Sequence, residues 1–146
     1  NTPSRLRQVA MNLIGNAVKF TDSGEVAVHI GGRPIIASPH GPAPAWMLEL
    51  SVRDTGLGIP EGERDRIFEP FVQVTLDAPR REGTGLGLAI SRSIARAMGG
   101  DVTVRSELGR GSTFTLSLPL SIEPFEHVVE LPPLRVLLVD DPARAR

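Results

Sequence analysis

Residues 83–100 read GTGLGLAISRSIARAMGG, and this stretch indicates most about the fold. Apolar residues recur at helical spacing over 86–98, which predicts an amphipathic helix, and Gly99 and Gly100 end it in the usual C-terminal way. Alternating glycines leave the backbone before the helix uncovered by side chains. The first turn of the helix offers unpaired N–H groups and the positive end of the helix dipole. The segment therefore suits a phosphate group, although a flexible loop leading into a helix explains the glycines equally well. It is neither a Walker A loop, because no Gly-Lys-Ser/Thr follows, nor a dinucleotide fingerprint, because Leu88 stands where the third glycine is needed.

The composition bounds the class of protein. The chain has 146 residues, with 16 Lys and Arg against 17 Asp and Glu. This length suits one domain, and the near-neutral charge argues against a protein that binds nucleic acid through a basic surface. Because cysteine is absent, disulfides, zinc-thiolate sites and thiol nucleophiles are excluded. No apolar run approaches the roughly 18 residues that span a bilayer, and no secretory signal opens the chain. We therefore expect a cytoplasmic protein without direct membrane contact.

The rest of the chain mixes helices and strands. Thr2 followed by Pro3 predicts a helix start, with a hydroxyl N-cap before a proline. Alternating apolar and polar residues over 48–52 predict a half-buried strand. The expected elements are helices over 2–20 and 61–68, strands over 26–30, 48–52, 102–105, 112–118 and 135–141, an exposed loop over 31–45 and a linker over 119–133. A hairpin between 102–105 and 112–118 implies antiparallel pairing, so the class is α/β, more narrowly α+β.

The first helix carries Asn12, Asn16 and Lys19 on one side, because steps of four and three residues stay within about 60° around a helix. That side borders the apolar stripe. Asparagine is intrinsically unfavourable inside a helix, so two of them one turn apart are either exposed or cap-satisfied amides or the wall of a polar ligand pocket. An amide oxygen is a good ligand for Mg²⁺ held mainly by phosphate oxygens, and Lys19 can meet phosphate charge.

A second candidate site is the sequence DTGLG at residues 54–58. Asp54 ends a predicted strand, and the glycines after it let backbone approach a flat ligand closely. An ionised Asp only accepts hydrogen bonds, so it suits the exocyclic amine of adenine and opposes the carbonyl of guanine. A simple Asp-Thr-Gly turn is the alternative. An aspartic protease is excluded, because that chemistry needs two carboxylates and only one such motif is present.

Four motifs together carry a resemblance. In order and spacing, NLIGNAVKF, DTGLGIP, IFEPF and GTGLGLAISRSIARAMGG resemble the N, G1, F and G2 boxes of histidine-kinase catalytic domains, a class of ATP-binding domains shared with gyrase and the Hsp90 chaperones. The match covers roughly residues 2–120. It implies a two-layer sandwich, with a mixed, mostly antiparallel sheet covered by helices on one face, and ATP beneath a lid between residues 59 and 85.

The resemblance also implies roles for individual residues. Asp54 would bind the adenine amine, with Thr113 close by through water, and Asn16 would ligate Mg²⁺. The candidate catalytic residues at the phosphate end are Asn12, Lys19, Arg80 and Arg81, of which the two arginines would reach the γ-phosphate unless they are a solvated basic pair. The remaining expected ATP contacts are Gly56 and Gly58, which start the lid, and Gly83, Thr84, Gly85, Leu86 and Gly87, which hold the triphosphate.

Two departures from the family pattern concern the lid and the base. Glu82 stands where family members usually have a glycine, and the segment after Gln73 is one residue short. In hydrolytic relatives a Glu four residues before the metal-binding Asn activates water, but here that residue is Asn12, and an amide cannot take a proton at neutral pH. The site is therefore better suited to holding ATP for phosphoryl transfer than to hydrolysing it.

The expected organisation is a catalytic domain over 1–120 without its first strand, a linker over 121–133, and the start of a receiver domain over 134–146. The sequence LRVLLVDD at 134–141 resembles the first strand of a receiver, although an extra edge strand is the alternative. The expected function is transfer of the γ-phosphate of ATP to a histidine on a separate dimerisation domain of the same protein, a hybrid sensor histidine kinase. A receiver domain or response regulator is the other expected partner. Two rivals are an anti-sigma-type serine kinase of the same fold and a degenerate nucleotide-binding scaffold.

Overall fold

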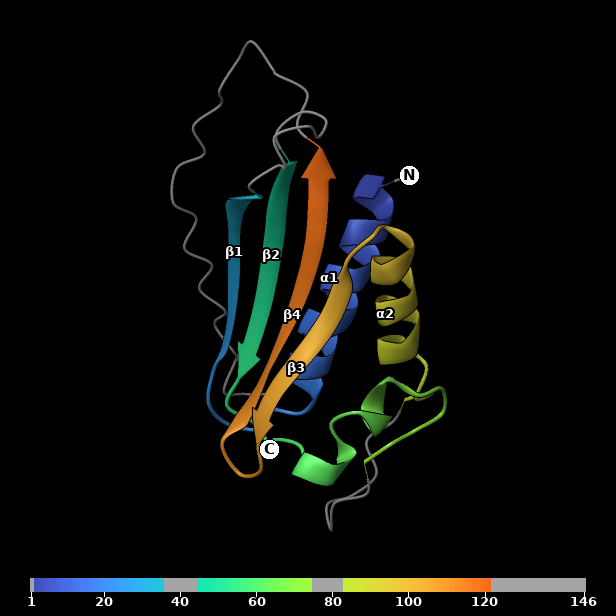
Figure 1. The fold of residues 1–146 in the computed structure, drawn as a ribbon. Coiled ribbons are helices and arrows are strands. Elements are labelled where there is room, and N and C mark those ends of the chain that lie inside the picture. The colour runs from blue at the N-terminus through green and yellow to red at the C-terminus, as the bar shows by residue number, and fades with distance from the viewer. Residues whose placement is uncertain (1, 36–44, 75–82, 122–146) are drawn as a thin grey trace.

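A four-stranded antiparallel sheet, ordered β1-β2-β4-β3, forms one layer, and helices α1 and α2 cover one of its faces (Figure 1). The computed structural model describes residues 2–35, 45–74 and 83–121. This arrangement confirms the predicted two-layer α+β class, and every strand pair among the described residues is antiparallel. The elements are α1 (Thr2–Lys19), β1 (Val26–Ile35), β2 (Ala45–Asp54), α2 (Gly87–Ala97), β3 (Asp101–Glu107) and β4 (Gly111–Ser121).

The two helices pack through narrow apolar stripes. In α1 the buried residues are Val9, Leu13 and Ala17, which are spaced by four and so share one face. Helix α2 ends where Gly100 N–H donates to the Ala95 carbonyl at 2.9 Å. Gly99 adopts a φ of +82° there, in the left-handed region that favours glycine. Neither helix, within the described ranges, is long and apolar enough to cross a membrane.

Successive side chains of β4 lie on opposite faces of the sheet. Phe114, Leu116 and Leu118 are buried, and their neighbours across the ladder in β2 are Val52, Leu50 and Leu48. Side chains two residues apart in a strand share a face, so these residues form the core beneath the helices. The same alternation brings Ser112 and Asp54, a directly paired couple, to the helix-covered face at the end of the sheet.

Three sequence predictions differ from the structure in extent. The loop expected over 31–45 begins later, because β1 continues to Ile35 and pairs with β2 through Gly31, Gly32 and Pro34. Proline is tolerated there because β1 is an edge strand. The helix expected over 61–68 is two 3₁₀ turns, Glu61–Glu63 and Arg66–Phe68, since so few residues rarely sustain an α-helix alone. The linker expected from 119 starts later, because β4 runs to Ser121; the strand expected over 135–141 lies outside the described residues.

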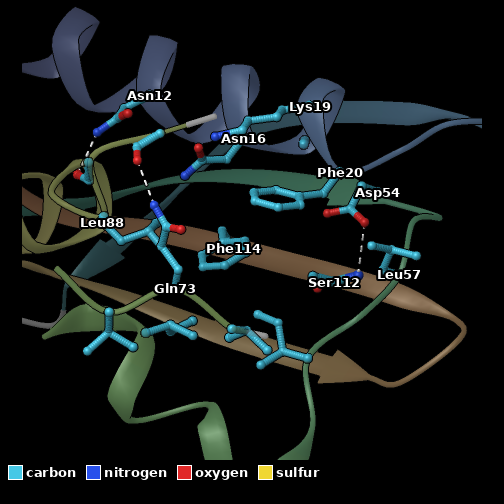
Figure 2. A pocket seen from close by; sticks show the side chains of 18 of the residues that line it. Asn12, Asn16, Lys19, Phe20, Asp54, Leu57, Gln73, Leu88, Ser112 and Phe114 are labelled. Carbon is cyan, nitrogen blue, oxygen red and sulfur yellow. Dashed lines mark hydrogen bonds between the residues drawn. The ribbon is translucent and has the colours of Figure 1, made fainter. Parts of the chain in front are cut away.

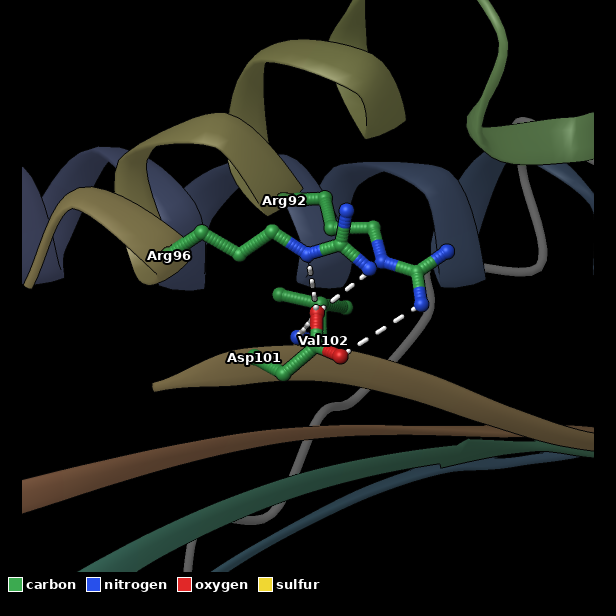
Figure 3. A network of polar contacts seen from close by, with 4 residues as sticks. All are labelled: Arg92, Arg96, Asp101 and Val102. Atoms are coloured by element: carbon green, nitrogen blue, oxygen red, sulfur yellow. Dashed lines mark hydrogen bonds and ion pairs between the residues drawn. The ribbon is translucent and has the colours of Figure 1, made fainter. Parts of the chain in front are cut away.

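An ionic cluster fastens α2 to β3 (Figure 3). Asp101 Oδ1 accepts from Arg92 Nε at 2.9 Å and from Arg96 Nε at 3.2 Å. The hydrogen bond from Arg92 is the largest cause that lowers the pKa of Asp101 below its ordinary value. Arg92 also stacks on Phe68, with 4.4 Å between the guanidinium carbon and the ring centroid. The cluster therefore ties α2 to the sheet and to the segment that follows β2.

Candidate functional site

A cavity of about 540 Å³ opens between α1, the end of the sheet, the segment between β2 and α2, and the first turn of α2 (Figure 2). Its size is ordinary for a small-molecule site. Asp54, Leu57 and Ser112 lie at one end, and Asn12 and Leu88 lie at the other (Figure 2). Residues from all three candidate motifs of the sequence therefore line a single cavity.

Asp54 closes the carboxylate end. Its side chain is 6% exposed, and its Oδ1 accepts hydrogen bonds from Gly56 N at 3.0 Å and Ser112 N at 3.3 Å. Burial raises the pKa of Asp54, and these two hydrogen bonds lower it by less. Because both bonds reach Oδ1, the other oxygen, Oδ2, is left as an acceptor directed to the cavity.

Gly56 and Gly58 are required by backbone packing around this end. A Cβ on Gly56 would lie 2.2 Å from the Phe20 carbonyl oxygen. Gly58 has a φ of +70°, and a Cβ there would lie 2.1 Å from the Glu107 carbonyl oxygen. Gly58 lines the cavity. Gly56 does not, but its backbone N–H donates a hydrogen bond to Asp54, which does. The two glycines thus let the start of the expected lid lie against Phe20, which follows α1, and against the β3–β4 turn.

Helix α1 lines the other part of the cavity with Asn12, Asn16 and Lys19, the three residues that the helical spacing placed on one side. Asn12 Nδ2 donates to the Gly87 carbonyl at 2.5 Å and to Ser91 Oγ at 2.8 Å. Lys19 Nζ reaches the opposite wall, where it would lie 2.5 Å from a Cβ on Gly83. The positive charge of Lys19 and the two amides therefore face the same space as the glycine-rich segment.

We name residues 83–87 the glycine collar. Gly83, Thr84, Gly85 and Gly87 line the cavity, whereas Leu86 does not. Gly83 O accepts from Gln73 Nε2 at 2.6 Å, and Gly85 O accepts from Phe71 N at 2.9 Å. Because Gly85 has a φ of +72° and a Cβ there would lie 2.9 Å from Phe71 backbone atoms, the collar is shaped by contact with residues 71–73 as well as by its own composition.

The expectation for Thr113 is wrong, and its neighbour takes the place. Thr113 pairs with Arg53 and Arg105 on the sheet face away from the helices, whereas Ser112 lies beside Asp54 and lines the cavity. The period-two alternation with Phe114 and Leu116 was the signal that identifies Ser112. The contact that anchors Asp54 comes from the Ser112 backbone, which no side-chain pattern reveals. Arg80 and Arg81 lie outside the described residues.

The oxygen atoms that line the cavity suit a cation that is bound together with a phosphate-bearing ligand. Across residues 2–35, 45–74 and 83–121, no three His, Cys, Asp or Glu side chains group as a metal site. Asn16 nevertheless lines the cavity and carries a neutral amide oxygen, and Mg²⁺ is commonly held by one or two protein oxygens together with phosphates and water. The residues present therefore fit Mg²⁺ bound chiefly by phosphate oxygens.

Comparison with known proteins gives consistent matches. The family described as histidine kinase-, DNA gyrase B-, and HSP90-like ATPase matches residues 1–122. The aerobic respiration control sensor protein ArcB of Escherichia coli K12 is 44% identical over 94% of this chain and 18% of its own length. The sensor histidine kinase AruS of Pseudomonas aeruginosa is 46% identical over 97% of this chain and 14% of its own. The chain thus spans less than a fifth of the curated relatives it matches.

Two solved structures share the fold. Full-length ShkA in complex with AMPPNP has a TM-score of 0.60 and 42% identity, covering 78% of this chain and 21% of that one. The mycobacterial sensor histidine kinase MprB has a TM-score of 0.56 and 29% identity, covering 80% of this chain and 70% of that one.

Proposed function

The chain belongs to the histidine kinase-, DNA gyrase B-, and HSP90-like ATPase family, and from this premise we propose that it is the ATP- and Mg²⁺-binding catalytic domain of a hybrid sensor histidine kinase. It delivers the γ-phosphate of ATP to a histidine carried by a separate dimerisation domain of the same protein. The names of its relatives, which are sensor proteins and sensor histidine kinases, and the AMPPNP complex of ShkA support this function.

One observation carries the proposal: a buried carboxylate at one end of a single cavity faces a glycine collar, two amides and a lysine at the other. The Asp54 Oδ2 accepts a hydrogen bond from the exocyclic amine of adenine, and Ser112 stands beside it. The collar backbone and Lys19 contact the phosphates, because exposed N–H groups at the start of α2 and a cation both favour anions.

Asn16 would supply the protein oxygen to Mg²⁺, which would offset the negative charge of the triphosphate. Asn12 lines the cavity together with Asn16 and hydrogen-bonds the Gly87 carbonyl at the end of the collar. Arg80 and Arg81 lie outside the described residues, and we assign them to the γ-phosphate on the family resemblance alone. The cavity itself then contributes position and charge, which are the main demands of phosphoryl transfer.

The domain proposal follows the same resemblance. Residues 1–120 form the catalytic domain, 121–133 a linker and 134–146 the start of a receiver domain. The curated relatives match 94% and 97% of the chain, so the similarity continues past residue 122, where the family match ends. We propose a receiver domain of the same protein, or a response regulator, as the next phosphoacceptor, because LRVLLVDD at 134–141 resembles the first strand of a receiver.

Binding is tested first, by calorimetry of the 146-residue chain with AMPPNP in the presence and absence of Mg²⁺. Transfer is then tested by adding [γ-³²P]ATP and a purified histidine-bearing dimerisation domain. The proposal expects Mg²⁺-dependent binding and an acid-labile, alkali-stable phosphate on the added domain. An acid-stable product on serine would instead identify a serine kinase, and tight binding without transfer would identify a nucleotide-binding scaffold. Either outcome overturns the histidine-kinase assignment.

A further inference from the structure

The side chain of Asn12 connects the two helices. Both hydrogens of its amide are committed to α2, because Nδ2 donates to the Gly87 carbonyl at 2.5 Å and to Ser91 Oγ at 2.8 Å. A carbonyl oxygen only accepts, so the Gly87 contact fixes which way the amide is turned. The amide therefore has one stable orientation, with Nδ2 toward these two acceptors. If the amide were turned over, its oxygen Oδ1 would face the Gly87 carbonyl oxygen, and both atoms are acceptors.

Two small residues of α2 make room for this contact. A Cβ on Gly87 would lie 2.7 Å from Asn12 Oδ1, so a larger residue at that position displaces the amide. Ser91, one turn later on the same face of α2, is 0% exposed. A buried hydroxyl is costly unless it is hydrogen-bonded, and Asn12 supplies the partner. Asn12, Gly87 and Ser91 therefore form one clamp across the helix pair.

We propose that Ser91 is a positioning residue of the nucleotide site, which acts through Asn12 to hold the first turn of α2 and the glycine collar at a fixed place against α1. The inference rests on the proposed function. Asn16 lies one turn beyond Asn12 on α1, and the collar ends at Gly87. The clamp thus sets the separation between the residue assigned to Mg²⁺ and the backbone assigned to the phosphates.

The clamp acts on one end of the cavity only. Asp54 is anchored by Gly56 N and Ser112 N, and neither residue belongs to α1 or α2. Loosening the clamp therefore weakens recognition of the triphosphate and leaves recognition of the adenine unchanged. A general loosening of the fold would weaken both.

The experiment compares Ser91→Ala with Ser93→Ala, a matched loss of a hydroxyl from an exposed position on the same helix. Each variant of the 146-residue chain is titrated with Mg²⁺–AMPPNP by calorimetry and with adenosine by chemical-shift changes in NMR. We expect Ser91→Ala to bind AMPPNP about three- to tenfold more weakly, the effect of one neutral hydrogen bond. Its affinity for adenosine stays at the wild-type value, and Ser93→Ala binds both ligands as the wild type does.

A second measurement needs no nucleotide. Hydrogen exchange of the Asn12 side-chain amide, followed in a ¹⁵N-labelled chain, is slow in the wild type and in Ser93→Ala and faster in Ser91→Ala. The inference is overturned if Ser91→Ala and Ser93→Ala match in AMPPNP affinity, or if Ser91→Ala loses AMPPNP and adenosine by the same factor. A wild-type chain that binds neither ligand overturns the proposed function instead, and the exchange rates then still report whether the clamp exists.

Discussion

Replacing Asp54 with Asn changes what the buried end of the cavity offers to a base. The Asn oxygen can keep both backbone hydrogen bonds, from Gly56 N at 3.0 Å and Ser112 N at 3.3 Å. The amide nitrogen then takes the place of Oδ2 and turns an acceptor into a donor. A donor opposes the exocyclic amine of adenine and matches the carbonyl of guanine. We therefore expect Asp54→Asn to weaken ATP binding and to relax the preference for adenine over guanine.

The size of the loss follows from the charge. A hydrogen bond to an ionised group contributes about 1.5–3 kcal/mol, so the affinity for AMPPNP should fall about 10- to 150-fold. Stability should not fall with it. Burial raises the pKa of Asp54 above its ordinary value, so the native state holds a proton to higher pH than the unfolded chain. The contribution of this group to stability therefore decreases as pH rises through the folded pKa, and removing the charge relieves a cost at neutral pH.

Calorimetry with Mg²⁺–AMPPNP and Mg²⁺–GMPPNP measures the switch, and thermal unfolding measures stability. Asp65→Asn, at an exposed acid in the segment after β2, is the matched control and should leave both ligands and the Tm unchanged. The reasoning is refuted if Asp54→Asn binds AMPPNP as the wild type does. It is equally refuted if the variant loses both nucleotides together with a Tm drop of several degrees, because the carboxylate would then serve the fold rather than the base.

Three further changes test other parts of the structure. Asn16→Ala should abolish most of the gain in AMPPNP affinity that Mg²⁺ gives the wild type, since it removes the protein oxygen assigned to the cation; paired titrations with Mg²⁺ and with EDTA measure that ratio, and an unchanged ratio would contradict the assignment. Gly85→Ala should lower the free energy of unfolding by about 1–3 kcal/mol in urea titrations, because Gly85 has a φ of +72° and its Cβ would lie 2.9 Å from Phe71 backbone atoms. Arg92 lowers the pKa of Asp101 below the ordinary 3.8, so the stability that this pair provides is present above that value and is lost as pH falls through the folded pKa. Asp101→Asn should therefore flatten the acid side of the stability–pH curve in urea titrations, and a curve as steep as that of the wild type would argue that the pair is not formed.

Local pattern predicted the helices and the central strands, because burial repeats there with a clear period. Leu13 and its neighbours on α1 recur every four residues, and Leu116 and its neighbours on β4 every two. The end of β1 could not be predicted in this way. Pro34 and the glycines before it are local signs of a loop, and only the ladder to Trp46 and its neighbours in β2 keeps them in a strand. That pairing depends on residues more than ten positions away, which a local pattern does not contain.

Side chains of the cavity were easier to predict than its backbone. Asn12, Asn16 and Lys19 follow from helix geometry, and the structure brings them to one wall. The groups that hold Asp54 are main-chain N–H groups, and the group of the collar that accepts from Gln73 Nε2 is the main-chain carbonyl of Gly83. Every residue type carries such groups, so the sequence does not mark where they converge. The family resemblance implied Thr113 beside Asp54, whereas the register between β2 and β4 pairs Asp54 with Ser112.

The polar groups around the cavity favour transfer of a phosphoryl group over its hydrolysis. Among the described residues that line the cavity, Asp54 is the only carboxylate and histidine is absent. Asp54 lies at the end away from Asn12 (Figure 2), and the Asn12 amide donates both its hydrogens to α2. An amide oxygen can hold a water molecule, but it cannot remove its proton at neutral pH. A neutral imidazole from another domain brings its own lone pair and needs no base from the cavity. The described part of the cavity therefore suits the proposed transfer to a nucleophile of that kind.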